Sequence, residues 1–383
     1  MCDNQALWLS QPFTSDELPW SHTHQDLKAA LLALGDAEVL QLHNCPQQRL
    51  TWFREREPDL CAALYAFEPE QTAVATPLHF DRVDSLHIPA RKWQQIVSFA
   101  GALPHKALPH VDWCAGKGHL SRVVQHNQQQ AVHCLEWDAS LVAIGKELAK
   151  QQGRDIHYYH HDVLQPLPAA CADPVKIHIG LHACGELHQY LLRHVVRTGA
   201  KAVAFSPCCY HKISTDHYLP SSSAARHTQL RLNRAALHLA VQDTVTARRG
   251  ERLLRERERL WRMGFDALQR ELRGVDDYLN VTSCKRELLR QDFPGFCRWA
   301  AYSRQLELPC DIDYDRYLQR GRERRSEIVR LELLRQLFHR PLELWLTLDY
   351  ALYLEENGYR VKVTQFCERS ISPRNLLIQG ERD

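Results

Sequence analysis

The feature that most constrains this 383-residue chain is the alternation of short apolar runs with amphipathic runs between residues 108 and 212. The apolar runs have the length of strands and cover residues 109–114, 131–136, 155–159, 175–181 and 200–206. Between them, residues 120–125, 140–151 and 187–198 have the apolar spacing of helices. Strands that alternate with helices in this way predict a mostly parallel sheet with helices on both faces.

The end of the chain returns to a strand-like sequence. Residues 360–366 and 375–379 flank Ser372-Pro373, and they predict an antiparallel hairpin at the edge of the same sheet. We therefore expect an α/β, Rossmann-like fold in four segments. These are an N-terminal region of unknown role at 1–87, a core at 88–219 that opens with a helix over 90–100, a helical insertion at 220–357 and the hairpin at 358–383. Residues 1–85 look irregular, with short helical patches.

A glycine turn follows the first expected strand. The sequence Val111-Asp112-Trp113-Cys114-Ala115-Gly116-Lys117-Gly118-His119 places an acid near the strand end and a Gly-x-Gly before a helix. Glycines permit positive φ and close approach of a ligand, and the helix start offers free N–H groups. The third glycine of the dinucleotide fingerprint is missing, since position 121 is Ser, which disfavours NAD and FAD. The turn instead fits the amino-acid end of S-adenosyl-L-methionine, with Asp112 binding its amino group directly or through water. The other turn residues expected to bind are Cys114, Ala115, Gly116 and Gly118.

Acids also mark the ends of the next two strands. Glu136 lies 24 residues after Asp112 and is placed to accept both ribose hydroxyls, with Asp138 close by. Asp162, 50 residues after Asp112, is placed beside Val163 to accept the adenine amino group. His182 ends the fourth strand, where the reacting methyl would lie. Any one of these acids alone is as easily a loop residue or a helix cap, but ligands of such sheets bind at this edge. The ordered set predicts a class I methyltransferase.

Three motifs resemble a known family. They are Asp112-Trp113-Cys114-Ala115-Gly116-Lys117-Gly118-His119-Leu120-Ser121, Leu181-His182-Ala183-Cys184-Gly185-Glu186-Leu187 and Ser206-Pro207-Cys208-Cys209-Tyr210-His211-Lys212. They are similar to the methyltransferase domain shared by glutathione S-transferase C-terminal domain-containing protein and the methyltransferase-like twenty-five proteins. The framing sequences Ile88-Pro89-Ala90-Arg91-Lys92-Trp93 and Ser372-Pro373-Arg374-Asn375 also resemble that family. The histidine and cysteine elements are distantly similar to acceptor-stem tRNA 2′-O-methyltransferases. The resemblance covers about residues 88–215 and 358–380, and it implies methyl transfer without naming a substrate.

The candidate catalytic residues follow the fourth and fifth strands. Because the methyl is already activated on sulfur, the protein must mainly aim a nucleophile and manage one proton. A histidine titrates near neutrality and suits the proton, and a lysine suits a phosphate. The candidates are His182, His211, Lys212, Cys208 and Tyr210.

Several sharper hypotheses remain open at these positions. Pro207-Cys208 allows a covalent thiolate attack on a pyrimidine, although free cysteines are more often small buried residues. Ser206-Pro207-Cys208-Cys209-Tyr210 partly resembles the motif that grips an exocyclic amine in amino-group methyltransferases. A metal at His182, Cys184, Cys208 and His211 has suitable ligand types, but their spacing is irregular and the chain has no Cys-x-x-Cys pair, so no metal is expected.

Charge is unevenly distributed along the chain. The net charge of +2 hides an acidic first hundred residues, with 7 Lys+Arg against 13 Asp+Glu. Residues 226–273 carry 12 arginines against 6 acids, and residues 316–340 carry 8 arginines against 3 acids. These helices predict an RNA-binding phosphate track, because the guanidinium suits phosphate. The alternative is a solvated helix that its own glutamates neutralise.

The 13 cysteines are odd in number and scattered, which is typical of a reducing compartment. Neither a secretory signal nor an apolar run of about 20 residues is found, so a cytoplasmic protein without a membrane segment is expected. Together these observations predict a methyltransferase that uses S-adenosyl-L-methionine and acts on tRNA or rRNA. A protein methyltransferase, or a donor-binding protein without catalysis, are the alternatives.

Overall fold

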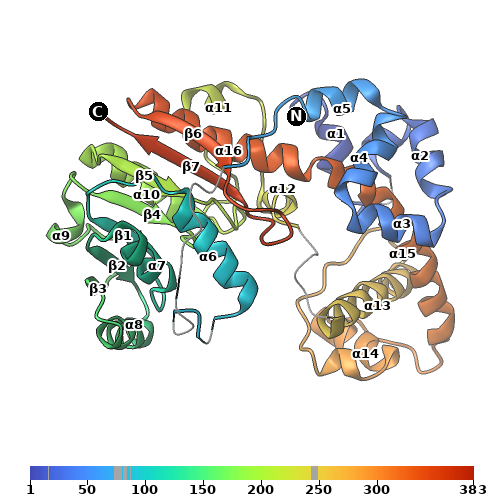
Figure 1. Cartoon of the computed structure of the whole chain (residues 1–383). Helices are drawn as coiled ribbons and strands as arrows, with labels where there is room; N and C mark the ends of the chain where they lie inside the picture. The colour runs from blue at the N-terminus through green and yellow to red at the C-terminus, as the bar shows by residue number, and fades with distance from the viewer. Residues whose placement is uncertain (16, 73–79, 81–83, 87, 243–248) are drawn as a thin grey trace. The chain divides into compact units, whose positions relative to one another are not determined.

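A seven-stranded sheet organises one of the two compact units in the computed structural model of the chain (Figure 1). The structure describes all residues except 16, 73–79, 81–83, 87 and 243–248. The sheet unit comprises Met1–Cys2, Leu64–Gln242 and His339–Asp383, and the helical unit comprises Asp3–Ala63 and Asp243–Phe338. Residues 220–242 and helix α16 (His339–Glu356), which lie within the expected insertion, therefore cluster with the sheet.

The sheet has the strand order β3-β2-β1-β4-β5-β7-β6. Strands β1 to β5 are parallel, and β7 runs antiparallel between β5 and β6. This arrangement confirms the expected α/β fold, with its mostly parallel sheet and C-terminal antiparallel hairpin. The strand bounds are β1 (His110–Trp113), β2 (Val132–Glu136), β3 (Ile156–His160), β4 (Ile177–Gly180), β5 (Ala202–Phe205), β6 (Arg360–Gln365) and β7 (Leu376–Glu381).

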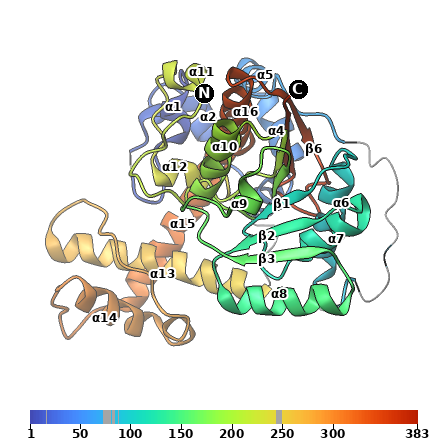
Figure 2. The same cartoon turned by 90° about the vertical axis from the view of Figure 1, so that its left-hand side faces the viewer.

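Helices cover both faces of the sheet. Helices α6 (Ala90–Ala102), α7 (His119–Gln128) and α8 (Ala139–Gln151) share one apolar core with the strands, and α10 (Glu186–Thr198) and α16 pack on the sheet elsewhere. Figure 2 shows α6 and α7 on one side of the strands and α10 on the other. Strands β1, β4 and β5 are buried at every position, as expected for the centre of a parallel sheet with two covered faces. A short helix, α9 (Ala169–Ala172), precedes β4.

The chain between β5 and the helical unit is tied to α16 by one carboxylate. Asp349, which is 1% exposed, accepts hydrogen bonds from the Tyr218 hydroxyl at 2.6 Å and from the backbone N–H groups of Ser221 and Ser222 at 2.9 and 2.7 Å. The Ser222 hydroxyl donates to it as well, at 2.7 Å. This cluster precedes α11 (Ser223–His227) and α12 (Arg234–Leu239), each of which begins with a side-chain cap.

The helical unit is built on two long helices, α13 (Arg249–Arg273) and α15 (Tyr314–Leu337), which pack closely against each other. Their backbones approach at Gly264 and Gly321, because a Cβ added to Gly321 would lie 2.6 Å from the Gly264 nitrogen. Helix α14 (Phe293–Ser303) and the 3-10 turn η2 (Leu288–Arg290) complete an apolar core with them. Among the described helices, none combines the length and the apolarity that a membrane span needs.

The N-terminal region is more regular than the sequence indicates. It forms α1 (Gln5–Trp8), η1 (Pro19–Ser21), α2 (Gln25–Leu32), α3 (Asp36–Asn44), α4 (Pro46–Arg54) and α5 (Pro58–Leu64). Helices α1 to α4 pack on α15. In α2 the buried residues Leu27 and Leu31 are four residues apart, which is a helical spacing. These helices are nine residues or shorter, so a periodic pattern in the sequence is weak, and packing against α15 stabilises α1 to α4.

Candidate functional site: the carboxyl edge of the parallel strands

The loop between β1 and α7 has the backbone geometry expected of a close-approach turn. Cys114, Gly116 and Gly118 all have positive φ, at 58°, 58° and 68°. The Ala115 N–H donates to the Leu135 carbonyl at 3.0 Å, which fastens the loop to β2. A Cβ at Gly116 would meet open space, whereas a Cβ at Gly118 would collide with the Tyr158 hydroxyl. The loop is therefore packed against the Tyr158 ring at Gly118, whereas the space next to Gly116 is open.

Asp112 lies beneath this loop and is 2% exposed. Its Oδ2 accepts a hydrogen bond of 2.5 Å from the Ser121 hydroxyl, which itself accepts one of 3.0 Å from the Cys134 thiol. Burial raises the pKa of Asp112 to about 7; the Ser121 hydrogen bond opposes this rise and the negative charge of Glu136 adds to it. From the sequence, Ser121 is notable only because it replaces the third glycine of the dinucleotide fingerprint. The structure shows that its hydroxyl group is hydrogen-bonded to Asp112.

Glu136 connects the end of β2 to the glycine loop. Its Oε2 accepts a hydrogen bond of 2.8 Å from the Gly116 N–H, and its Oε1 accepts one of 2.9 Å from the Asp138 N–H. A carboxylate has about four acceptor positions, so half of them stay available to a ligand. Asp138 itself caps α8, accepting hydrogen bonds from the N–H groups of Ser140 and Leu141 at 2.8 and 3.3 Å. Asp138 therefore has a structural role that the sequence prediction of donor binding did not include.

The end of β3 contributes Asp162 and Val163. Asp162 is half-buried and accepts a hydrogen bond of 3.0 Å from the Leu164 N–H, and Val163 is buried. Trp137 directly follows Glu136 at the end of β2; it is 69% exposed, and its ring centroid lies 6.4 Å from that of His160 at the end of β3. Sequence reasoning missed Trp137; an aromatic directly after a strand-end acid was the available signal. An exposed tryptophan at this edge offers a face for stacking.

The loops after β4 and β5 are joined through their backbones. The N–H of Gly185 donates to the Cys208 carbonyl, and the N–H of Glu186 donates to the Lys212 carbonyl, both at 2.9 Å. The Glu186 carboxylate accepts hydrogen bonds from the Ser214 N–H and hydroxyl at 3.1 and 2.9 Å. The structure therefore brings the two histidine- and cysteine-containing motifs together.

His182 and His211 have different surroundings at this edge. His182 is exposed, yet desolvation by the surrounding chain lowers the pKa of its imidazole, and the positive charge of Lys92 lowers it further. A neutral imidazole is able to accept a proton. His211 is half-buried, with its ring centroid 4.9 Å from that of His238. Lys212 is exposed beside it.

Tyr210 points into the core rather than toward the strand edge. It is 1% exposed, its hydroxyl lies 3.1 Å from that of Thr347 in α16, and its ring stacks on Tyr350. Burial raises the pKa of Tyr210 well above its ordinary value. Tyr210 is thus buried against α16, so it supports the loop and does not face the strand edge.

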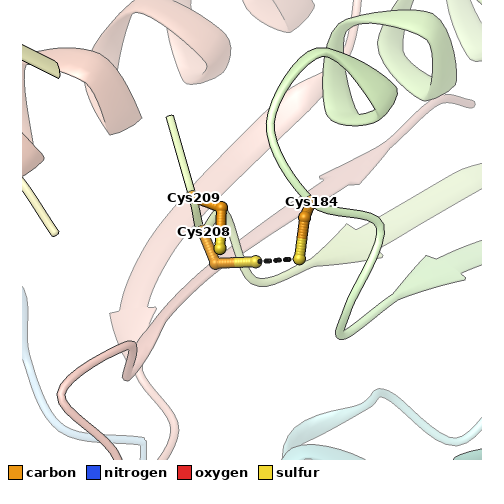
Figure 3. A group of neighbouring side chains, drawn as sticks. All are labelled: Cys184, Cys208 and Cys209. Atoms are coloured by element: carbon orange, nitrogen blue, oxygen red, sulfur yellow. Dashed lines mark hydrogen bonds between the residues drawn. The ribbon is translucent and has the colours of Figure 1, made fainter. Parts of the chain in front are cut away.

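Cys208 lies beside two other cysteines. The Sγ atoms of Cys184, Cys208 and Cys209 all lie within 4.8 Å of one another, and those of Cys184 and Cys208 are 3.2 Å apart (Figure 3). Hydrogen bonds from the other two thiols, with the positive charges of Lys212 and His211, hold the pKa of Cys209 below its usual range. Hydrogen bonds with Cys184 and Cys209, together with burial, raise the pKa of Cys208.

The comparison with family models bears on this edge directly. Residues 91–216 match the model of a family described as a methyltransferase domain. The matched range contains β1 to β5 and every strand-end residue described above. The sheet order and the antiparallel β7, together with this match over residues 91–216, define the class: the sheet unit has the α/β class I methyltransferase fold.

Individual relatives are more distant. The chain is similar to glutathione S-transferase C-terminal domain-containing protein of Mus musculus, with 25% identity over 212 residues, 52% of this chain and 30% of that protein. The chain thus matches less than a third of that relative's length. Three solved structures are also similar, each with a TM-score of 0.25: the 23S rRNA methyltransferase ErmE (19% identity, 30% of this chain and 45% of that chain), the Pyrococcus abyssi tRNA (uracil-54, C5)-methyltransferase with S-adenosyl-L-homocysteine (10%, 30% and 27%), and a SAM dependent methyltransferase from Aquifex aeolicus (17%, 33% and 72%).

Proposed function

We propose that this protein is a methyltransferase that uses S-adenosyl-L-methionine and acts on RNA. The observation that carries the donor assignment is the ordered set of Asp112, Glu136 and Asp162 at the ends of three adjacent strands, around one glycine loop. Glu136 holds the loop through the Gly116 N–H and keeps acceptor positions for hydroxyl groups. The donor, when bound, supplies a methyl group on a positively charged sulfur.

The residues at this edge fit such a donor. The space above Gly116 is open, and exposed Trp137 follows β2 with its ring near His160 of β3, so a planar base has a surface to stack on there. Asp112 is buried next to the loop, and a ligand ammonium near it would favour its ionised form. His182 lies at the end of β4, where it is placed to accept the one proton that a hydroxyl or amine nucleophile releases.

The RNA substrate is supported by one surface of the helical unit. Arg252, Arg255 and Arg259 in α13 are exposed, and their spacing of three and four residues places them along one helical face. No ion pair or hydrogen bond joins these three side chains to another part of the described chain. A row of unneutralised guanidinium groups is the surface that phosphates bind.

Donor binding is tested by calorimetry with S-adenosyl-L-homocysteine. We expect measurable binding to the wild-type chain and a loss of at least about tenfold in Glu136→Ala, because its carboxylate both orders the loop and accepts from the ligand, each worth about 1–2 kcal/mol. Glu147→Ala is the matched control, since Glu147 is an exposed glutamate of the neighbouring α8. Equal binding by both variants would refute the donor site.

The substrate is tested by mass spectrometry of nucleosides. RNA from a strain without this gene should lack one methylated nucleoside that the parent strain contains, and the purified protein should restore it with labelled donor. Transfer of tritium to protein instead of RNA would replace the proposal by a protein methyltransferase. Donor binding without transfer to any extract would indicate a non-catalytic role.

A further inference from the structure

We propose that Cys184, Cys208 and Cys209 bind a zinc ion through their three thiolates. Their sulfur atoms lie within 4.8 Å of one another, and Figure 3 shows them converging from two loops. Cys184 follows β4, and the other two follow β5. Three soft sulfur ligands that meet at one point form a donor set that binds zinc in preference to magnesium, because magnesium favours oxygen ligands.

The backbone holds the three cysteines in place without help from a metal. The Gly185 N–H donates to the Cys208 carbonyl, and the Lys212 N–H donates to the Cys209 carbonyl, both at 2.9 Å. Gly185 has φ of 64°, and a Cβ there would collide with the Lys212 carbonyl oxygen, so only glycine lets the loops approach this closely. The geometry that brings the sulfurs together is therefore built into the two loops.

The backbone conformation of Cys209 is a second indication that the loop is shaped to bring the sulfur atoms together. Its φ is 50°, a left-handed conformation that a side chain makes costly, and such conformations are concentrated at binding and active sites. The unusual backbone directs consecutive cysteines, 208 and 209, to the same sulfur cluster. In an extended strand, neighbouring side chains would point to opposite faces.

The surroundings suit an anionic metal centre. Zinc with three thiolates carries one net negative charge, and Lys212 and His211 lie close enough to act electrostatically on Cys209. The Nδ1 atom of His211 is buried and has no hydrogen-bond partner in the described part of the chain. Zinc usually takes four ligands, so three thiolates leave one position for a water molecule.

A simple disulfide explains the cluster less completely. A bond between Cys184 and Cys208 would leave Cys209, and its left-handed backbone, without a role. A metal ion uses all three sulfurs, and each thiol releases its proton on binding. The inference is independent of the methyl donor and of the RNA substrate, because metal content is read without either.

The test measures zinc in the 383-residue chain, loaded with zinc chloride under reducing conditions and then desalted. We expect about one zinc per chain by atomic emission, and a loss of most of it in each of Cys184→Ser, Cys208→Ser and Cys209→Ser. Cys284→Ser is the matched control: Cys284 is half-buried like Cys184 and Cys209 but lies in the helical unit. It should keep the zinc.

A measurement on the wild-type protein guards against misfolded variants. X-ray absorption at the zinc edge should show three sulfur neighbours at about 2.3 Å, and cobalt loading should produce thiolate charge-transfer bands. A wild-type chain that retains no zinc after loading would overturn the proposal. So would a zinc shell without sulfur, or alkylation mapping that finds Cys184 and Cys208 joined as a disulfide in the protein as isolated.

Discussion

Ionisation of the buried Asp112 carboxyl group lowers the stability of the folded chain, at the point where we propose that the donor binds. Its carboxyl group is buried under the glycine loop and has one hydrogen-bonded neighbour of its own, Ser121. Burial raises its pKa from 3.8 to about 7, so the folded chain resists its ionisation between these values. The destabilisation is absent below pH 4, grows as the pH rises and is complete above pH 7.

Asp112→Asn should therefore stabilise the protein at alkaline pH while weakening donor binding. The neutral amide avoids the ionisation cost, which amounts to at most about 4 kcal/mol for a shift of this size. We expect the free energy of unfolding in urea to exceed that of the wild type at pH 8, and the excess to shrink as the pH falls toward 4. S-adenosyl-L-homocysteine should bind the variant less tightly. A stability difference that does not change with pH would show that Asp112 ionises freely in the folded chain.

At the scale of elements, the crossing of α13 and α15 depends on two glycines. A Cβ at Gly321 would lie 2.6 Å from the nitrogen and 2.9 Å from the Cα of Gly264, so the helices would have to separate. Gly321→Ala should cost about 1–3 kcal/mol of unfolding free energy, because the strain of overpacking exceeds the gain of up to about 1 kcal/mol in helix propensity. Chemical denaturation measures the change.

Gly250→Ala, in the partner helix α13, is the control. A Cβ at Gly250 meets nothing within 4 Å, so only the propensity gain applies there. This variant should be as stable as the wild type or more stable by up to about 1 kcal/mol. If both alanine variants were stabilised, the close approach of the two helix backbones would be wrong.

The connection after β5 depends on Asp349 in α16. Asp349→Ala would leave the buried Tyr218 hydroxyl and the Ser222 N–H without their acceptor, at a cost of about 3–5 kcal/mol. Asp349→Asn keeps one oxygen acceptor and should lose less. Thermal unfolding of the two variants, followed by circular dichroism, provides the comparison. Equal stability of Asp349→Ala and the wild type would contradict the role of this carboxylate.

The sheet was predictable from the sequence because the residues that end its strands and begin its helices act locally. Gly116 and Gly118 end β1 and start α7, and the strand-end acids Glu136 and Asp162 stand where β2 and β3 stop. These signals depend on backbone conformation and on neighbours within a few residues. The predicted strands at 109–114, 131–136, 155–159, 175–181 and 200–206 each contain the observed strand or differ from it by one residue.

The cysteine cluster was not predictable in the same way. Cys184 and Cys208 are 24 residues apart and meet only because β4 and β5 are neighbours and Gly185 lets their loops touch. The sequence offers Cys184 and Cys208 as possible metal ligands together with His182 and His211, but their spacing matches no common metal-site pattern and nothing in it points to Cys209. For a similar reason, the burial of Tyr210 against α16 was hidden, since the covering helix lies more than a hundred residues later.

At the scale of the whole molecule, the arginines divide into two groups. In 316–340 most of them are held within the chain: Arg316 and Arg320 pair with Glu271, Arg330 with Asp36, Arg335 with Glu332, and Arg340 with Glu343. The exposed pairs of Arg316 and Arg320 with Glu271 add little stability each, whereas the Arg340–Glu343 pair is buried; all of these pairs neutralise the arginine charge locally. The arginines of α13 at 252, 255 and 259 have no such partners in the described structure. We therefore restrict the proposed phosphate track to the face of α13 that carries Arg252, Arg255 and Arg259.

Replacing this face should change how RNA affinity depends on salt. We expect the triple variant Arg252→Ala, Arg255→Ala, Arg259→Ala to bind bulk tRNA more weakly, with the slope of log affinity against log salt reduced by roughly 2–3, about one for each phosphate that is no longer neutralised. The double variant Arg316→Ala, Arg320→Ala removes exposed arginines that are paired with Glu271, so its slope should stay near that of the wild type. Filter binding across a salt series measures both. Equal slopes in all three proteins would exclude this face of α13 from RNA binding, whereas a reduced slope only in the double variant would move the track to α15.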